Sequence, residues 1–218
     1  MAHFFYLHGF ASSPSSNKAR DFAQRFAERG INLHVPDLNV PDFEHLTLTA
    51  MLAKVADEVR ACPPGDVYLL GSSMGGAVAL HFVDRYRHAE GARVARLFLM
   101  APAFDFAGNR WHDLGEAGIT AWRETGGHEF FNYAAGGLRR VHYGLFEDLQ
   151  RYDSDSLQLD LPIMIFHGQH DESVDVEQSL RFASSRPNVD LHVVDSDHQL
   201  LDQVDVMWTA VQTFFDLP

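Results

Sequence analysis

The sequence predicts an α/β fold in which helices cover both faces of a mostly parallel sheet of about six strands. Short apolar runs alternate along the chain with longer segments in which apolar residues recur at helical spacing. The short runs are apolar at nearly every position, which is typical of strands that are buried on both faces. Right-handed crossovers between such strands place helices on both sides of the sheet.

Six short runs predict the strands in chain order. Each run is rich in aliphatic or aromatic residues and is bounded by Gly, Pro or polar residues. The expected strands lie at or within residues 3–9, 31–38, 66–71, 92–103, 161–168 and 189–195.

Five segments between and after these runs predict helices. In the first, Ala19, Phe22 and Phe26 recur at helical spacing and Gly30 closes the segment. A pair of prolines stops the second helix, and the third begins almost directly after a strand. The expected helices cover residues 15–30, 47–62, 74–88, 173–185 and 199–216.

The segment 104–160 breaks this alternation. It contains no expected strand, it is rich in aromatic residues, and it is too long for a plain crossover. We therefore expect one domain over residues 1–218, with a small, partly helical cap at 104–160 over one end of the sheet. The alternative is an extended helix pair with ordinary packing. The aromatic residues predict an apolar acyl or aryl pocket, although a core for the cap itself explains them equally well.

Composition narrows the functional classes. The chain has 218 residues and a net charge of −13, which argues against nucleic acid and anionic membrane surfaces as partners. The single cysteine excludes an internal disulfide. No run approaches the roughly 20 apolar residues of a membrane span, and the first residues lack the basic region of a signal peptide. We therefore expect a cytoplasmic protein that acts on a small molecule.

The stretch LLGSSMGGAVAL at 69–80 predicts a nucleophile on a sharp strand-to-helix turn. At the apex of such a turn the backbone is strained, and the residues two positions away on either side must be nearly bare. Gly71 and Gly75 flank Ser73 in this way, whereas Leu70 and Met74 flank Ser72. The glycine register therefore selects Ser73. A phosphate-binding loop is excluded because no lysine follows the glycines, and the first strand-helix turn has no dinucleotide fingerprint.

A serine nucleophile needs a base, and the base needs an acid that orients it. Asp171 lies just past the fifth expected strand and His198 just past the sixth, which is the chain order expected for this type of elbow. Because the carboxyl ends of parallel strands share one edge of a sheet, Ser73, Asp171 and His198 are expected to converge there.

Other acids and histidines fit these roles less well. Asp175 is expected to cap the following helix, and the side chain of Asp197 is expected to point away from its neighbour His198. Four other histidines precede the last strand, lie inside it or lie on a helix; they are His81, His167, His170 and His192.

Two backbone N–H groups are expected to hold the oxyanion. One belongs to Met74, at the positive end of the helix that follows the nucleophile. The other belongs to Phe10, in the loop after the first strand, where Gly9 lets the backbone turn. His8 is expected either to brace this loop or to be a buried core histidine.

At these positions the sequence resembles the α/β-hydrolase superfamily. The matching pieces span nearly the whole chain and are LHGF at 7–10, GSSMGG at 71–76, HGQHDESV at 167–174 and DSDH at 195–198. YLHGFASSPSSNKA together with GSSMGG resembles a branch of small bacterial serine carboxylesterases and acyl thioesterases. The resemblance implies the triad and hydrolysis of esters or thioesters. The full sheet of the family usually has two further strands before the strand that leads into the oxyanion loop. In this sequence that strand begins at residue 3, so we expect a trimmed sheet without those two strands.

The sequence therefore predicts a serine hydrolase that cleaves carboxylic esters or thioesters through an acyl-enzyme, with no metal and no organic cofactor. Hydrolysis of a carbon–carbon bond in a diketone ring-cleavage product uses the same triad and is the alternative among enzymes. A ligand-binding module without catalysis is the alternative from another class, and an intact triad argues against it.

Overall fold

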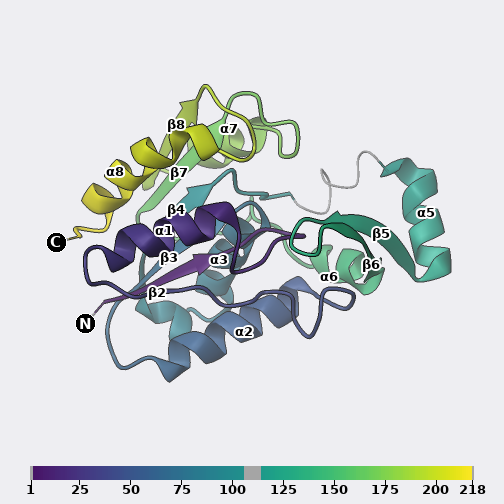
Figure 1. The fold of residues 1–218 in the computed structure, drawn as a ribbon, viewed down its shortest axis with the longest axis horizontal. Coiled ribbons are helices and arrows are strands. Elements are labelled where there is room, and N and C mark those ends of the chain that lie inside the picture. The colour runs from purple at the N-terminus through teal and green to yellow at the C-terminus, as the bar shows by residue number, and fades with distance from the viewer. Residues whose placement is uncertain (1, 106–113, 218) are drawn as a thin grey trace.

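The computed structural model describes residues 2–105 and 114–217 and has a parallel six-stranded sheet at its centre (Figure 1). The strand order is β2-β1-β3-β4-β7-β8, and every neighbouring pair is parallel. The strands are β1 His3–Leu7, β2 Leu33–His34, β3 Val67–Ser72, β4 Val94–Met100, β7 Ile163–Gly168 and β8 Val189–Val194. The expected trimmed sheet of parallel strands is confirmed, although β2 pairs over a shorter stretch than the apolar run suggested.

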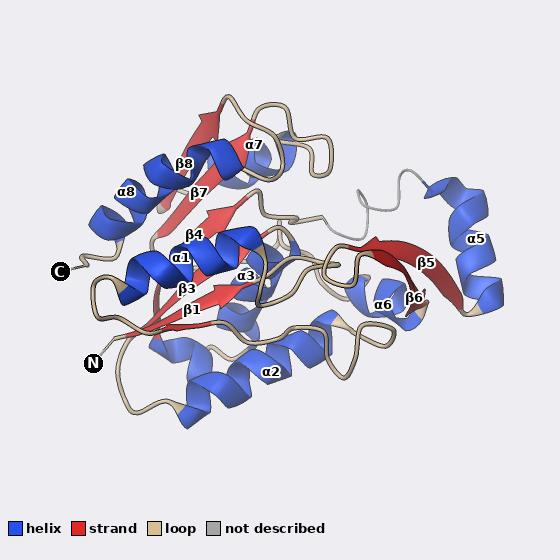
Figure 2. Cartoon of the chain, viewed as in Figure 1, coloured by secondary structure: helices blue, strands red, loops and turns tan. Residues whose placement is uncertain are grey.

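Helices cover both faces of this sheet (Figure 2). One buried cluster joins the sheet to α1 and α8, and a second cluster joins its other face to α2, α3 and α7. The helices are α1 Asn17–Ala27, α2 Leu48–Ala61, α3 Met74–Arg85, α7 Glu177–Ser184 and α8 Val204–Phe214. In the part of the chain that the structure describes, no helix is long and apolar enough to cross a membrane.

Strand β1 shows why the central strands are largely apolar. All five of its residues are buried, and only the first, His3, is polar. Phe5 and Leu7 belong to the cluster under α2 and α3, whereas Phe4 and Tyr6 belong to the cluster under α1 and α8. Successive side chains of a strand point to opposite faces, so a strand covered on both sides needs apolar residues on both.

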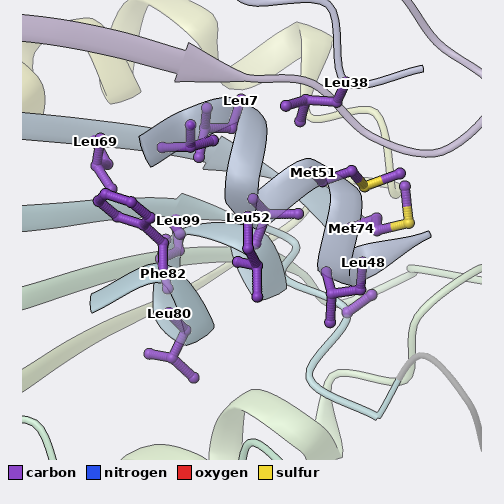
Figure 3. Close-up of a cluster of buried hydrophobic side chains, with 14 of the residues drawn as sticks. Leu7, Leu38, Leu48, Met51, Leu52, Leu69, Met74, Leu80, Phe82 and Leu99 are labelled. Carbon is purple, nitrogen blue, oxygen red and sulfur yellow. The ribbon is translucent and has the colours of Figure 1, made fainter. Parts of the chain in front are cut away.

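The core under α2 and α3 fixes the start of α3, where the site lies. Figure 3 shows side chains of the sheet and of both helices in this cluster, with Met74 at its edge beside Met51 and Leu48. Met74 is only 1% exposed. Its burial anchors the backbone directly after Ser73.

The segment between β4 and β7 differs from the sequence-based expectation, because it contains two strands. β5 Gly127–Asn132 and β6 Gly137–His142 form an antiparallel hairpin, preceded by α5 Gly115–Thr125 and followed by α6 Gly144–Leu149. The expectation of no strand was wrong because half of the residues of this hairpin are exposed, so its residues are mixed in polarity and form no apolar run.

Aromatic side chains of this segment pack mainly on one another. Trp122 is buried, and its ring lies 5.3 Å from Phe130 and 5.6 Å from Tyr143. Phe146 stacks on Tyr143 at 5.4 Å. These aromatic residues therefore form a local core, while Phe106 and Trp111 lie outside the described residues. The loop of the hairpin reaches the loop after β1, where the N–H of Tyr133 donates to the carbonyl of Ala11 at 3.0 Å.

Two of the expected helices begin later than the sequence suggested. α7 begins at Glu177 rather than near residue 173, because the N–H groups of Ser173 and Val174 donate to the Asp171 side chain instead of joining a helix. Before α8, residues 201–203 form a short 3-10 turn. Both changes lengthen the loops that carry Asp171 and His198.

Candidate active site

Ser73 occupies the sharp turn between β3 and α3. Its φ of 54° and ψ of −120° lie in a region that residues other than glycine rarely adopt. Hydrogen bonds hold this conformation, since the Ser73 N–H donates to Met100 O at 2.9 Å and the Ser73 carbonyl accepts from Gly76 N at 2.9 Å. The expected strained apex is therefore at Ser73 and not at Ser72.

The two flanking glycines leave no room for a side chain. A Cβ atom at Gly71 would lie 2.6 Å from the carbonyl oxygen of Gly75. A Cβ atom at Gly75 would lie 2.0 Å from the carbonyl oxygen of Leu7, at the end of β1. The first contact closes the turn on itself, and the second lets α3 approach the strand that leads into the loop at Gly9 and Phe10.

The structure brings Ser73, His198 and Asp171 together from three loops at one edge of the sheet. Nε2 of His198 lies 3.1 Å from Oγ of Ser73, and Nδ1 of His198 lies 2.7 Å from Oδ2 of Asp171. A carboxylate only accepts hydrogen bonds, so Nδ1 carries the proton and Nε2 is left to accept the proton of the serine hydroxyl. This arrangement suits a base that activates a hydroxyl nucleophile.

Asp171 is fully buried and accepts four hydrogen bonds. Oδ1 accepts from the N–H groups of Ser173 and Val174 at 2.8 Å each, and Oδ2 faces His198 at 2.7 Å and His167 at 3.1 Å. Burial by itself raises the pKa of this carboxyl group. The hydrogen bonds from His167, His198 and Val174 outweigh burial and hold the pKa of Asp171 well below its usual range.

His167 is the contact that sequence reasoning missed. Its Nε2 lies 3.1 Å from Oδ2 of Asp171 and 3.0 Å from the carbonyl oxygen of Val174, so Nε2 carries the proton. Its Nδ1 accepts from the Ser179 hydroxyl at 2.7 Å. By its place in the sequence, His167 is only a rival base. A histidine at the end of a buried strand, just before the acid, was the available signal.

The loop after β1 passes directly against Ser73. A Cβ atom at Gly9 would lie 3.1 Å from Cβ of Ser73, so the backbone just before Phe10 lies beside this side chain. Met74 is the first residue of α3. The two residues expected to hold the oxyanion thus lie on either side of Ser73.

His8 links this loop to the segment after β2. Its Nε2 accepts from Leu38 N at 3.0 Å, and its Nδ1 donates to the carbonyl oxygen of Gly9 at 2.9 Å. Burial lowers the pKa of His8, so its ring is neutral at pH 7. His8 is both a buried histidine and a brace for the loop at Gly9, which reconciles the two alternatives.

Ser72, the neighbour of Ser73, also has a hydrogen-bond partner. The side chain of Ser72 shares a hydrogen bond with the Tyr6 hydroxyl group, whose pKa is raised by burial and partly lowered by this contact. Ser72 points toward β1 rather than toward His198.

The remaining candidate acids and bases make contacts with other groups. Asp197 accepts from Gln199 N and Leu200 N, and Asp175 accepts from Glu177 N just before α7. The rival histidines each contact another group: His81 lies against Ser154, His170 against Asp195, and His192 against Phe166.

A cavity of about 430 Å³ opens at Ser73 and His198. Hydroxyl groups dominate its lining, and the segment 104–160 contributes only Tyr133 and Ala134 to it. The expected apolar pocket formed by the cap aromatics is therefore wrong for the described residues, since most of those side chains pack in the local core. The cavity is lined by Tyr6, Gly9, Phe10, Ser12, Ser13, Ser15, Ser16, Asn17, Lys18, Ser72, Ser73, Tyr133, Ala134, Ser173, His198, Gln199 and Leu201.

Potential metal ligands gather at the opposite edge of the sheet. His3, His34 and Cys62 place ligand atoms within 4.8 Å of one another. His3 is the first residue of β1, His34 is the second residue of the short strand β2, and Cys62 directly follows α2. A metal held there would not contact Ser73 or His198.

The parallel sheet, the flanking helices and the serine at the turn after β3 define the α/β-hydrolase fold. A candidate hydrolase from Agrobacterium vitis S4 is 24% identical, with 97% of this chain and 87% of that chain covered at a TM-score of 0.83. Mouse alpha/beta hydrolase domain-containing protein 10 is 20% identical, with 98% and 89% covered at a TM-score of 0.79. Est1E from Butyrivibrio proteoclasticus, solved with ferulic acid bound, is 19% identical, with 99% and 88% covered at a TM-score of 0.75.

The chain belongs to the uncharacterised protein family UPF0227, whose model matches residues 3–215. A comparison with curated protein sequences returns no match.

Proposed function

We propose that this protein is a serine hydrolase that cleaves carboxylic esters or thioesters. The observation that carries the proposal is the hydrogen-bonded series from Asp171 through His198 to Ser73, with distances of 2.7 and 3.1 Å. The fold supports it, because solved structures with this fold include proteins described as hydrolases and as lipolytic enzymes. Those descriptions apply to those proteins. For this chain, the geometry of its own Ser73, His198 and Asp171 supports the proposal.

In the proposed first step, Oγ of Ser73 attacks the acyl carbonyl carbon. Nε2 of His198 takes the hydroxyl proton as the bond forms, and the carbonyl oxygen becomes an oxyanion. The N–H groups of Phe10 and Met74 donate hydrogen bonds to this oxyanion. The positive end of α3 adds to this stabilisation because Met74 is the first residue of that helix.

The tetrahedral intermediate then collapses. His198 gives its proton to the leaving alcohol or thiol, and the acyl group stays on Ser73. His198 next activates a water molecule that releases the carboxylic acid and restores the serine. In both steps Asp171 accepts the hydrogen bond from Nδ1, which fixes the ring and stabilises the imidazolium ion.

We also propose that residues 104–160 act as a cap that borders the substrate. The described link is the hydrogen bond from Tyr133 N to Ala11 O, which joins the β5–β6 loop to the loop that follows β1. Tyr133 is 67% exposed and lines the cavity, so it is placed to contact a bound substrate.

The test measures hydrolysis by the purified protein of three substrates that differ in the bond to be cleaved. They are p-nitrophenyl butyrate, butyryl-CoA and a vinylogous diketone of ring-cleavage type. The proposal predicts turnover of the ester or thioester, and its loss in Ser73→Ala. Cleavage of the diketone alone would favour the carbon–carbon hydrolase. Binding of the substrates without any turnover would favour a ligand-binding module.

A further inference from the structure

Lys18 places a positively charged side chain in the cavity of the candidate nucleophile. It is the second residue of α1, it is half-buried, and it lines the same cavity as Ser73 and His198. Among the residues that the structure describes, Lys18 forms no ion pair and its ammonium group donates no hydrogen bond. The only other lysine of the chain, Lys54, pairs with Glu58 at 2.7 Å.

A buried ammonium group without a partner is costly, because it loses water and gains nothing in return. This burial lowers the pKa of Lys18 to about 8, and the charges of Asp171 and Asp197 oppose the shift. Neither carboxylate pairs with Lys18. Asp171 is saturated by His198, His167 and two backbone N–H groups. The ammonium is thus still largely charged at pH 7 and lacks a direct counter-ion.

The charge of the cavity lining is opposite in sign to the net charge of the protein. The chain has a net charge of −13, yet the described lining contains no Asp or Glu and its one Lys or Arg is Lys18. Hydroxyl groups of Ser12, Ser13, Ser15 and Ser16 line the same region, and hydroxyls can donate hydrogen bonds to an anion. A substrate anion is therefore favoured in this cavity, whereas the rest of the protein repels it.

We propose that Lys18 binds an anionic group of the substrate, so that esters or thioesters carrying a carboxylate or phosphate are preferred over neutral ones of the same size. The inference rests on the proposed hydrolase activity and deepens it. A cavity of about 430 Å³ has room for a small acyl group together with such a charge. The substrate anion supplies the counter-ion that Lys18 lacks.

A competing explanation assigns Lys18 a purely electrostatic role beside the triad, in which its charge acts on Asp171. That role would affect every substrate equally. The two explanations therefore differ in the ratio of kcat/KM for charged and neutral substrates, and not in kcat/KM itself.

The experiment compares two matched substrate pairs. Phenyl hydrogen adipate against phenyl hexanoate places the charge on the acyl side, and 4-acetoxybenzoate against 4-acetoxyacetophenone places it on the leaving group. For at least one pair, the charged-to-neutral ratio of kcat/KM should fall about ten-fold or more in Lys18→Met, be largely retained in Lys18→Arg, and stay at the wild-type value in Lys54→Met. The preference should also fade as the pH rises through about 8, because Lys18 then loses its proton.

Equal losses for charged and neutral esters in Lys18→Met, or no charge preference in either pair, would overturn the proposal while leaving the hydrolase intact. If neither an ester nor a thioester is hydrolysed, the proposed function fails instead.

A binding measurement covers the case in which Lys18→Met does not fold. The two lysines are reductively methylated with carbon-13 in the wild-type protein, and their NMR resonances are followed against pH. Adipate or 4-hydroxybenzoate, the products that retain the anionic group of the charged substrates, should raise the titration midpoint of Lys18 and leave that of Lys54 unchanged. An unchanged Lys18 midpoint with both products contradicts the proposal.

Discussion

Replacing Asp171 by Asn is expected to nearly abolish activity while leaving the fold intact. The change removes one charge and turns one acceptor oxygen into an NH₂ group, which only donates. All four groups around Asp171 are donors, so the new amide must face two of them with its NH₂ group.

The structure indicates which orientation the amide takes. If the NH₂ group faces Ser173 and Val174, two backbone N–H groups are left without an acceptor, at a cost of about 1–3 kcal/mol each. If it faces the histidines instead, the His198 ring can move its proton to Nε2, and His167 keeps its Nε2 proton on the carbonyl oxygen of Val174. The second orientation is cheaper, and it makes Nδ1 of His198 an acceptor. Nε2 then carries a proton toward Ser73 and cannot take one from it.

We therefore expect kcat to fall about 10³- to 10⁴-fold, which corresponds to about 4–5.5 kcal/mol of lost transition-state stabilisation. KM should change little, because Asp171 does not line the cavity. The assay is steady-state hydrolysis of p-nitrophenyl butyrate, with circular dichroism to check the fold.

The matched control is Asp197→Asn, which removes the same charge beside His198. Its Oδ1 accepts from the N–H groups of Gln199 and Leu200, and an amide oxygen can do the same. Activity toward the neutral ester should stay within about two- to three-fold of wild type, since exposed charges are strongly screened. A loss of less than ten-fold in Asp171→Asn, or similar losses in both variants, would refute this account of Asp171.

Two further predictions concern the supports of the site. Gly75→Ala should destabilise the protein by about 3 kcal/mol, because its Cβ would lie 2.0 Å from Leu7 O. In the control Gly30→Ala the new Cβ meets no atom within 4 Å, so this change should cost only backbone strain. Urea unfolding measures the free energy of unfolding of both variants. His167→Phe should raise the pKa of Asp171 by removing a donated hydrogen bond. Because the pKa of Asp171 is depressed, its charge stabilises the folded protein at pH values above the ordinary aspartate pKa, and this stabilisation is lost as the pH falls. The variant should therefore unfold at a higher pH than wild type during acid titration. An unchanged midpoint contradicts this role of His167.

The sequence predicted the sheet and the strained turn at Ser73 for physical reasons that local patterns retain. Strands covered on both faces are apolar along most of their length, and Phe4, Phe5, Tyr6 and Leu7 of β1 show this. A strained turn requires bare neighbours, so Gly71 and Gly75 identified Ser73. Parallel topology then predicted that the loops after β7 and β8 meet at Ser73, and the structure places Asp171 and His198 there.

Other features depend on contacts that no local pattern records. The hairpin β5–β6 exposes residues such as Glu129 and Arg139, so its strands lack an apolar signature. His167 contacts Asp171 only because the loop folds back over the end of β7. Lys18 belongs to none of the motifs that the sequence offers. Its position in the cavity depends on how α1 packs beside the elbow, which tertiary structure alone determines.

The central claim is that Ser73 is the nucleophile, and site mapping with a fluorophosphonate probe tests it most directly. The probe forms a covalent bond with a serine that a base activates, and peptide mass spectrometry then identifies the labelled residue. The account predicts one adduct on Ser73, which persists in Ser72→Ala and is lost in His198→Ala. An adduct on Ser72 or another serine, or no adduct in wild-type protein that hydrolyses esters, would contradict it.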